Sequence, residues 1–483
     1  MIHNPSAPRP AAAFCSRIFE TKSFLVLTFV IASCFAVCAT PSGAASASEK
    51  TATAGPDSAV LAGLDADASA DVHALEKYAA AVRELLQQEK FNRLEEIAAT
   101  ARSEKSRFAG GTWKLYVIYR ALREPAEGRE APDEAWEAHL ERLSAWALSD
   151  PNSVTARIAL AEANLKYVER TRIDANNTPS NARPRTPGAD PWEVINGSIN
   201  IAEVALKQAS DLGAKDPHWY FVEQELKYGG DKGLLDKAVL LEPSYYPNYR
   251  LHALFLHPKW DGAEGAPERF ADEISAQIGG KQGLAAYFEV AETLSCGPSA
   301  VTRPKMSWEK VKLGYAALEE LYGSSIIKLN QYACLALHEG DMSLAQQLFA
   351  RIGDNWDAPT WKTKSYFDSS KALAAAPEEI RTLRMVTDAN GITPMGNEYF
   401  MQISVDFQRK ERFNFMECAR PLGANLGGSF DLFLKFAADG TLEEVKVWPQ
   451  TKFNACFVPK LSGNFAPPPQ PHYWVKIGMS IPY

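Results

Sequence analysis

The stretch LNQYACLALHEGDMSLAQQLFARI, residues 329–352, decides the fold of the larger part of this chain. Ala345, Phe349 and Ile352 recur at three- and four-residue steps, which is the spacing that places side chains on one face of a helix. Gly340 and Asp341 interrupt this pattern, and such a pair predicts a tight corner. The stretch is therefore predicted to form two helices joined by a short turn.

Similar helix pairs recur towards the N-terminus. In the stretch from residue 72 to residue 105, Glu89 and Lys90 mark a break between two helical patterns. Pro151, Pro217 and Pro243 each follow a helical pattern that a proline cannot continue. These prolines are unevenly spaced, so the array is degenerate. In the stretch 329–352, the small residue Ala345 lies where the two helices meet, and the aromatic residue Phe349 follows four positions later. This pattern resembles the tetratricopeptide repeat.

We therefore expect residues 71–380 to form a tetratricopeptide-like superhelix of stacked helix pairs. Within it, HALFLHPKWDGAEGAPERFADEI (252–274), MSWEKVKLGYAALEELYG (306–323) and RIGDNWDAPTW (351–361) carry a second resemblance. They resemble an exported bacterial family of repeat-like helical proteins that is known only as a domain of unknown function. The resemblance covers residues 85–361 and implies a fold, but it brings no catalytic residues.

The end of the chain has a different period. In SFDLFLKFAADGTLEEVKVWPQT, residues 429–451, apolar side chains alternate from Phe430 to Phe436, as in a strand with one face on a core. Asp439-Gly440 is a favoured hairpin turn, after which Val445 and Val447 supply a returning strand. A short helix then has to end or kink at Pro459, and the segment from residue 473 to residue 481 alternates again.

This order of strand, turn, strand, helix and strand resembles the C-terminal domain of TonB-like energy transducers. The resemblance runs from residue 427 to residue 483, with residues 381–426 expected to connect it to the helical array. It implies a small α+β module that binds other proteins, often by strand pairing. TonB proteins also have an uncleaved anchor and a long spacer rich in Pro, Lys and Glu. A helical array stands in that place here, so the resemblance implies the fold and a binding tendency but no energy coupling.

The N-terminus has the features of a secretory signal peptide. Arg17 and Lys22 precede an uncharged apolar run over residues 24–39, and Ala45-Ser46-Ala47 offers a cleavage site. We expect a leader over residues 1–47, a flexible linker over residues 48–70, and a periplasmic or secreted protein. Two alternatives stay open: an uncleaved anchor, and a lipoprotein cut before Cys34. In either case the membrane contact would be made only through the N-terminus.

The cysteines fit an exported protein. Three of the seven lie in the leader, which leaves an even set in an oxidising compartment. Cys418 and Cys456 bracket the first hairpin of the last module and are predicted to form a disulfide. Cys296 and Cys334 form a possible second disulfide.

Catalytic and metal-binding patterns are weak in this sequence. Two S-x-x-K matches, at Ser307 and Ser325, lack the partner motifs of a penicillin-binding site. Cys334 and His338 are four residues apart and could face one metal ion, but without a second ligand pair nearby we interpret them as packed side chains. We therefore predict no catalytic residues, no cofactor and no metal.

Aromatic residues at helix starts allow two interpretations, core packing or an exposed groove for peptides or glycans. These possible binding-surface residues are Trp219, Tyr220, Tyr245, Tyr246 and Trp260. The net charge of −8, from 51 basic and 59 acidic residues, and the lack of a basic stripe argue against nucleic-acid binding.

The preferred hypothesis is a non-enzymatic scaffold or adaptor in the bacterial cell envelope whose partners are other envelope proteins or peptides. The alternatives are an envelope hydrolase with scattered catalytic residues and a membrane-anchored, TonB-like transducer.

Overall fold

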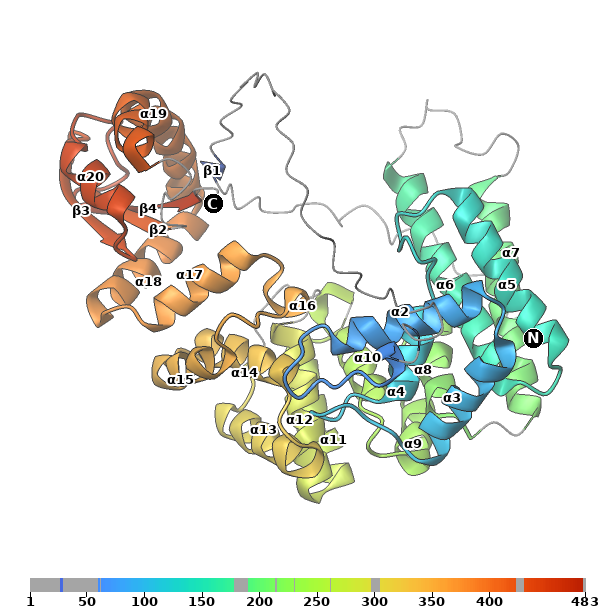
Figure 1. Cartoon of the computed structure of the whole chain (residues 1–483). Helices are drawn as coiled ribbons and strands as arrows, with labels where there is room; N and C mark the ends of the chain where they lie inside the picture. The colour runs from blue at the N-terminus through green and yellow to red at the C-terminus, as the bar shows by residue number, and fades with distance from the viewer. Residues whose placement is uncertain are drawn as a thin grey trace, which may run out of the picture. The chain divides into compact units, whose positions relative to one another are not determined.

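The computed structural model describes residues 27–28, 60, 62–177, 190–212, 215–229, 231–260, 262–296, 305–422 and 430–480. This part of the chain is mostly helical, with a small antiparallel sheet near the C-terminus (Figure 1). It divides into two compact units. The array unit comprises residues 50–340 and 350–360, and the sheet unit comprises residues 1–49, 341–349 and 361–483.

The predicted leader lies outside the described residues, apart from the two-residue strand β1 (Leu27–Thr28). Residues 48–59 and 61 of the predicted linker lie outside them as well, whereas residues 60 and 62–70 are described, and Leu64 and Ala68 among them are buried in the core of the array unit. Among the described residues, no helix combines the length and the apolar character that crossing a membrane requires.

Helices make up the array unit, together with the short 3-10 helix η1 (Pro258–Trp260). They are α2 (Ala74–Gln87), α3 (Phe91–Ser103), α4 (Lys114–Leu122), α5 (Asp133–Ser149), α6 (Val154–Asn177), α7 (Pro191–Asp211), α8 (Pro217–Leu226), α9 (Lys232–Leu241), α10 (Pro247–Phe255), α11 (Ala266–Ile278), α12 (Gly280–Ser295), α13 (Trp308–Tyr322) and α14 (Ile326–Glu339). Two further helices, α15 (Met342–Ile352) and α16 (Ala358–Trp361), contain residues of both units.

Local sequence explains where these helices begin and end. Pro217 opens α8 behind Asp216, whose carboxylate accepts the N–H of His218, and Asp231 caps α9 in the same way. Gly340 has a left-handed backbone, with φ of 78°, at the predicted corner between α14 and α15. The predicted helix pairs around Glu89 and Gly340 are therefore confirmed.

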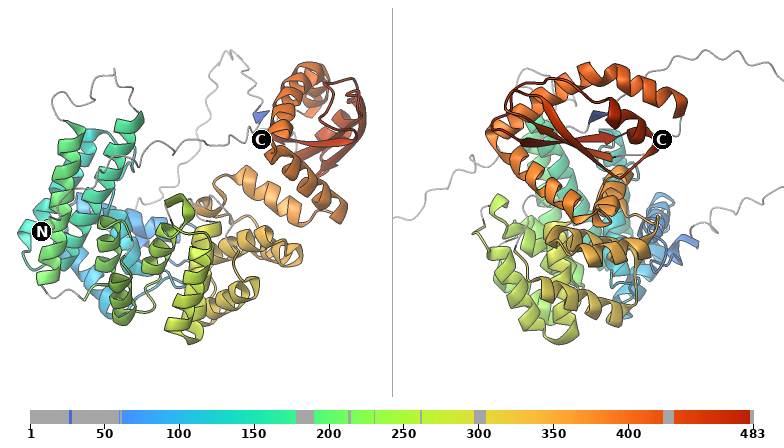
Figure 2. Two further views of the ribbon diagram at one scale, coloured as in Figure 1. Left: turned by 180° about the vertical axis from the view of Figure 1, so that it is seen from behind. Right: turned by 90° about the vertical axis from the view of Figure 1, so that its left-hand side faces the viewer.

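Alternate helices of the array unit contact one another in chain order. Helices α4, α6, α8, α10, α12 and α14 form one continuous row of neighbours. The intervening helices α5, α7, α9, α11 and α13 each pack against members of that row, and the long helices α6 and α7 lie side by side in Figures 1 and 2. Each helix pair thus buries its apolar face against the next pair.

The segment before α4 also contacts helices much further along the array. The indole of Trp113 donates to the carbonyl of Ser244, at 2.8 Å, just before α10. The amide of Gly110 donates to the carbonyl of Gly323, at 3.2 Å, in the turn between α13 and α14. Early residues therefore cover part of the later helices, and the array is not a simple open stack.

The sheet unit holds three antiparallel strands: β2 (Phe430–Phe436), β3 (Leu442–Trp448) and β4 (Tyr473–Ser480). β2 lies in the middle, with Leu432 opposite Val447 on one side and Ile477 on the other. The short β1 pairs with β4 in parallel, so the order is β1-β4-β2-β3. The predicted hairpin is confirmed, and Gly440 at its turn has φ of 86°.

Helices cover both faces of this sheet. They are α17 (Lys364–Ala374), α18 (Glu378–Ile392), α19 (Pro394–Ala419) and α20 (Lys452–Phe457), with the 3-10 helices η2 (Arg420–Leu422) and η3 (Val458–Lys460). Aromatic residues of α19 and α20 pack on the face that holds Phe430 and Phe436. Figure 2 shows the ribbon of α19 beside the sheet. On the other face, Phe433 packs against Ile380 of α18.

This packing changes the domain boundaries expected from the sequence. Residues 381–426 were expected to connect two domains, yet they contribute most of α18 and the whole of α19, which enclose the sheet. The sheet unit therefore takes in the residues from 361 onward, well before the predicted boundary at residue 427. The physical reason is that Phe433 makes the second face of the sheet apolar too, so both faces require a helix.

Candidate functional site

An open groove of about 430 Å³ runs along β3, the strand at one edge of the sheet. This volume falls within the range of ligand-sized pockets, roughly 300–1,000 Å³. The start of α18 forms one wall, and α20 with η3 forms the other. The lining residues are Pro377, Ile380, Val445, Lys446, Val447, Trp448, Gln450, Asn454, Ala455, Val458 and Pro459.

The walls of this groove are held in place by specific local contacts. Thr451 and Asn454 form a capping box that starts α20, each side chain accepting the backbone N–H of the other residue. The indole of Trp448 donates to the carbonyl of Ala372, at 2.6 Å, and so ties β3 to the end of α17. These contacts fix the spacing of the walls without filling the groove.

A disulfide fastens the wall formed by α20. The sulfur atoms of Cys418, near the end of α19, and Cys456, in α20, lie 2.01 Å apart, as the predicted disulfide requires. Cys296 and Cys334 in the array unit also lie at a bonding distance, 2.21 Å. Both cysteine pairs named from the sequence are therefore brought together.

The chemistry of the groove suits an extended polypeptide. Val445, Val447 and Val458 give it an apolar lining, while alternate peptide groups of an edge strand point away from the sheet. Lys446 forms an ion pair with Glu379 at 3.0 Å, and this hydrogen bond raises the pKa of the Lys446 ammonium. A cation and an apolar strip are what an added strand would contact, whereas the amide of Leu442 already donates to the carbonyl of Gly463 and the carbonyl of Val447 accepts from the side chain of Gln450.

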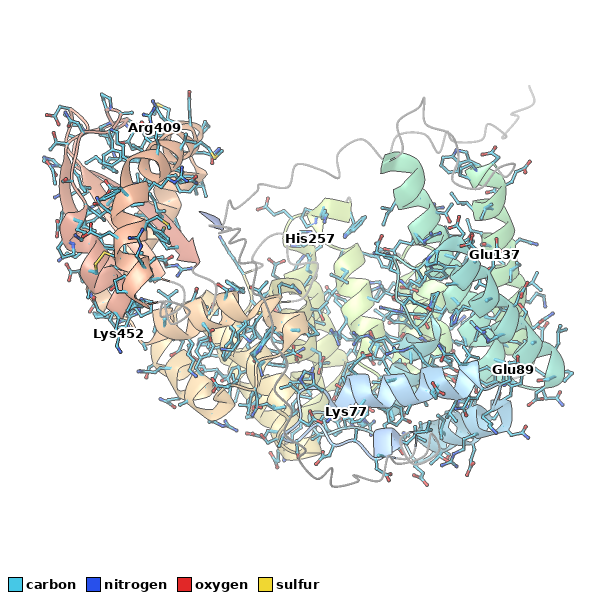
Figure 3. All side chains as sticks on the ribbon, turned by 45° about the horizontal axis from the view of Figure 1, so that its top comes forward. Lys77, Glu89, Glu137, His257, Arg409 and Lys452 are labelled. Atoms are coloured by element: carbon cyan, nitrogen blue, oxygen red, sulfur yellow. A yellow bond between two sulfur atoms is a disulfide. The ribbon has the colours of Figure 1, made fainter. Side chains whose placement is uncertain are left out.

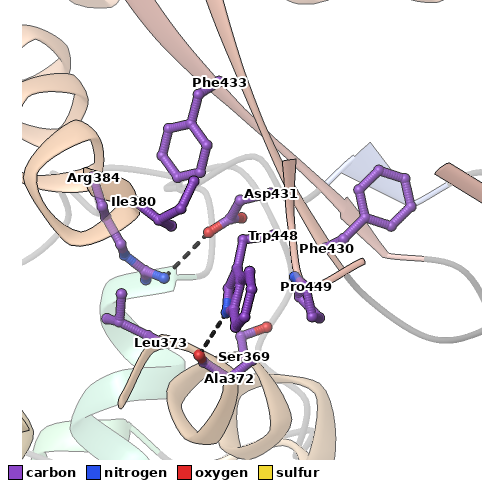
Figure 4. Close-up of a pocket in the computed structure, with 10 residues that line it drawn as sticks. All are labelled: Ser369, Ala372, Leu373, Ile380, Arg384, Phe430, Asp431, Phe433, Trp448 and Pro449. Carbon is purple, nitrogen blue, oxygen red and sulfur yellow. Dashed lines mark hydrogen bonds and ion pairs between the residues drawn. The ribbon is translucent and has the colours of Figure 1, made fainter. Parts of the chain in front are cut away.

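A second cavity lies beneath the sheet, on the α18 side, and is shown in Figure 4. Its volume is about 10 Å³, which is enough for a single water molecule. Arg384 forms an ion pair there with Asp431, at 3.2 Å, and burial raises the pKa of the Asp431 carboxyl. This cavity is too small to be a ligand site, and its polar side chains hold α18 on the sheet.

The array unit contains buried polar clusters that require a separate explanation. The carboxylate of Asp216 accepts hydrogen bonds from Arg102 at 2.8 Å, from the hydroxyl of Tyr119 at 2.7 Å and from the amide of His218. Asp216 has no exposed surface. It therefore links α3, α4 and α8 through charge-assisted hydrogen bonds, which is a structural role.

Glu162, His218 and Tyr245 form the arrangement closest to a catalytic one. The two imidazole nitrogens of His218 lie 2.8 Å from Glu162 and 2.8 Å from the hydroxyl of Tyr245. All three residues are at most 1% exposed, and burial raises the pKa of Tyr245 well above its ordinary value. A neutral phenol with no access to substrate cannot act as a nucleophile. We assign these side chains to helix packing.

A further cluster joins α10, α12 and α14. Lys328 lies 2.5 Å from Glu289, and Arg250 lies 3.3 Å from Glu292. Burial raises the pKa of Glu292. This cluster stands between neighbouring helices of the continuous row, and together with the Asp216 cluster it shows that buried charge pairs recur within the array unit.

The structure separates the five aromatic residues predicted as possible binding-surface residues. Tyr245 and Tyr246 are buried and bond to His218 and Tyr322, so they belong to the core and not to a surface. Trp219 and Tyr220 are half-buried and pack edge to face. Trp260 alone among the five is clearly exposed, at 41%. Of the two interpretations left open by the sequence, core packing holds for Tyr245 and Tyr246, and the five residues do not share one degree of exposure.

The residues of the β3 groove were missed because its two walls come from separate parts of the chain. Val445 and Val447 were recognised as a strand, but nothing in their spacing indicated an open edge. Pro377 and Ile380, some 65 residues earlier, belonged to no predicted element of this module.

Comparison of the chain with protein-family models, with curated proteins and with solved structures finds no match. The site therefore has to be judged by its own geometry.

Proposed function

We propose that this chain is an exported, non-enzymatic adaptor of the bacterial cell envelope that captures an extended segment of another protein. The single observation that carries the proposal is the open groove along the edge strand β3, lined by its residues from Val445 to Trp448. In this proposal the bound segment pairs with β3 and places alternate apolar side chains against Val445 and Val458.

Two features of the fold support the proposal. The alternating contacts of α4 to α14 are compatible with the proposed tetratricopeptide-like array. The order of β2, the Asp439-Gly440 turn, β3, α20 and β4 resembles that of a TonB-like module, a class that often binds by strand pairing. Two cysteine pairs at bonding distance are compatible with an oxidising compartment such as the periplasm.

The proposal places binding at the sheet edge and not on the row of array helices. Residues 105–113 and α4 already contact α8, the turn before α10 and the turn between α13 and α14. These internal contacts occupy surface that a ligand would otherwise use. The array then serves as a rigid body that carries the binding module.

Photocrosslinking in living cells tests the proposal. Ala455 is exposed and lines the groove, whereas Lys452 is exposed on the same short helix and does not line it (Figure 3). A photoreactive amino acid at position 455 should capture a discrete envelope protein, and sequencing the crosslinked peptide should give an extended segment with alternating apolar residues.

The matched control is the same photoreactive residue at position 452, which should capture much less of that protein. A free Ala455→Trp chain, which fills the groove, should fail to compete for the partner, whereas a Lys452→Trp chain should compete as well as the unmodified protein. Equal capture from both positions, or equal competition by both tryptophan variants, would refute binding in the groove.

A further inference from the structure

Three potential metal ligands meet in the array unit at the ends of α12 and α14. Cys296 caps the C-terminus of α12, and Cys334 and His338 lie one turn apart on α14. One ligand atom from each residue lies within 4.8 Å of the other two. The imidazole of His338 faces both sulfur atoms, with Nδ1 3.8 Å from Cys296 Sγ and Nε2 3.9 Å from Cys334 Sγ.

The two cysteines are more deeply buried than His338. The two cysteines are 5% and 2% exposed, while His338 is half-buried and so borders the surface. A small reductant or a metal ion can therefore approach from the His338 side. An imidazole beside a cysteine also favours the thiolate, which is the form that attacks disulfides and binds metals.

We propose that Cys296, Cys334 and His338 form a redox-gated site for a borderline-soft divalent cation, Zn²⁺ in the first place. When the cysteines are joined, the site is closed because a disulfide sulfur is a poor ligand. When they are reduced, two thiolates and one imidazole nitrogen provide three protein ligands, with the fourth position left to water. This inference does not depend on the proposed adaptor function.

A dithiol can reduce the disulfide between Cys296 and Cys334. The dithiol transfers two electrons and two protons to the disulfide, becomes a cyclic disulfide itself, and leaves two thiols at Cys296 and Cys334. Zn²⁺ then displaces the two thiol protons as it binds. The resulting centre of one Zn²⁺, two thiolates and one neutral imidazole has no net charge, which suits a buried position.

The geometry requires a local rearrangement of the imidazole and the sulfur atoms. Zinc–sulfur bonds of about 2.3 Å and zinc–nitrogen bonds of about 2.0 Å place sulfur and nitrogen roughly 3.6 Å apart in a tetrahedron. At present each sulfur atom faces a different nitrogen of His338, at 3.8 and 3.9 Å, so the imidazole has to turn until one nitrogen lies near both sulfur atoms. The two sulfur atoms must move apart after reduction, and a Cα–Cα separation of 6.2 Å allows this by side-chain rotation.

The chain contains its own control, since Cys418 and Cys456 form a second pair with the same sequence separation of 38 residues. The experiment treats the full chain with dithiothreitol, removes the reductant without oxygen, and titrates Zn²⁺ against a chromophoric chelator. Co²⁺ in parallel reports thiolate ligation by its charge-transfer absorption. We expect one tightly bound ion per reduced chain and none per oxidised chain.

Three variants assign the site. Cys296→Ala with Cys334→Ala should abolish binding, and Cys418→Ala with Cys456→Ala should leave it at one ion per chain. His338→Asn should retain the fold of the oxidised protein and weaken Zn²⁺ binding at least about tenfold, because one of three ligands is lost. The inference is overturned if the reduced chain binds no stoichiometric Zn²⁺. It is also overturned if His338→Asn binds as tightly as the unmodified protein.

Discussion

The two units of this molecule bury different kinds of side chain. Between its helices the array unit buries charges, among them Asp216, Glu162, Glu289 and Glu292, each with a cationic or hydrogen-bonding partner. Around its sheet the sheet unit buries mainly aromatic residues such as Phe407, Phe436 and Phe453. Both units bury aromatic side chains and each holds one disulfide, so the feature that distinguishes the array unit is its set of buried, matched charges.

The difference follows from size and shape. A small sheet covered on both faces gains enough apolar contact from a few aromatic rings, and a disulfide limits the entropy of its unfolded chain. A row of helices has to fix many neighbours in register, and directional charge-assisted hydrogen bonds serve that purpose. Each of the following changes tests one side of this contrast.

The largest effect is expected at Asp216. Asp216→Ala leaves Arg102 and the hydroxyl of Tyr119 without their shared acceptor and removes the cap of α8. Breaking a buried pair in this way should lower the free energy of unfolding of the array unit by about 3–5 kcal/mol. Urea unfolding followed by hydrogen exchange of α3, α4 and α8 measures it.

Asp216→Asn is the matched control, because it keeps the side-chain oxygen Oδ1 that caps α8 but replaces Oδ2, which accepts from Arg102 and Tyr119, with an NH2 group. It should cost less than Asp216→Ala. If both variants are as stable as the unmodified protein, the buried charges do not hold the array together.

Removing either disulfide should lower the free energy of unfolding by a similar amount, each in its own unit. Each closes a sequence separation of 38 residues, so removing either pair by double alanine substitution should cost about 3–4 kcal/mol. Loss of Cys418 and Cys456 should speed hydrogen exchange in the sheet unit alone, and loss of Cys296 and Cys334 in the array unit alone. Changes that spread equally over both units would contradict the division of the chain.

Lowering the pH should lower the free energy of unfolding of the array unit, because the buried imidazole of His252 is stable only in its neutral form. Burial lowers the pKa of this imidazole to about 4 in the folded chain, below its ordinary value near 6.5. The unfolded chain then binds the proton first, so the stability due to neutral His252 is present above pH 6.5 and is lost as the pH falls towards 4. Between pH 6.0 and 5.0 this loss should be about 1 kcal/mol.

The measurement compares urea unfolding of the unmodified protein and of His252→Gln at these two pH values. The variant should lose about 1 kcal/mol less over the interval. His472→Gln, an exposed position in the sheet unit, should leave the acid response of the array unchanged. An identical pH dependence with and without His252 would show that this histidine is not held neutral.

The smallest effect is expected for charges at the surface. Lys310 and Asp272 form an ion pair at 2.6 Å, but both side chains are about half exposed. Lys310→Ala should change the free energy of unfolding by less than about 0.5 kcal/mol, because water screens such pairs. A loss as large as that of Asp216→Ala would remove the distinction between buried and exposed charges.

The sequence predicts those elements whose signal is local. The alternation from Phe430 to Phe436, the Asp439-Gly440 turn and the corner at Gly340 each depend on a few neighbouring residues, and all are found in the structure. The pair Cys418–Cys456 was identified from its position around the hairpin, and Cys296–Cys334 was named as a possible second disulfide from the even number of cysteines.

Features that depend on distant contacts could not be predicted. Tyr245 and Tyr246 have the same local pattern whether they are buried or exposed, and burial is decided by residues such as Trp113 far earlier in the chain. The stripe of Tyr399, Ile403 and Phe407 indicates an amphipathic helix but not the sheet that it covers. Likewise, Cys334 and His338 alone suggested no metal site, and the proposed site depends on Cys296, which the fold brings beside them.

The most direct test of the adaptor proposal is hydrogen exchange of β3 in the presence of the captured segment. A synthetic peptide with the sequence of the segment crosslinked at position 455 should bind the full-length protein and slow the exchange of amide hydrogens between Leu442 and Trp448. Ala455→Trp should remove that protection. Binding that leaves β3 unprotected, or protection confined to the array helices, would contradict docking at the sheet edge.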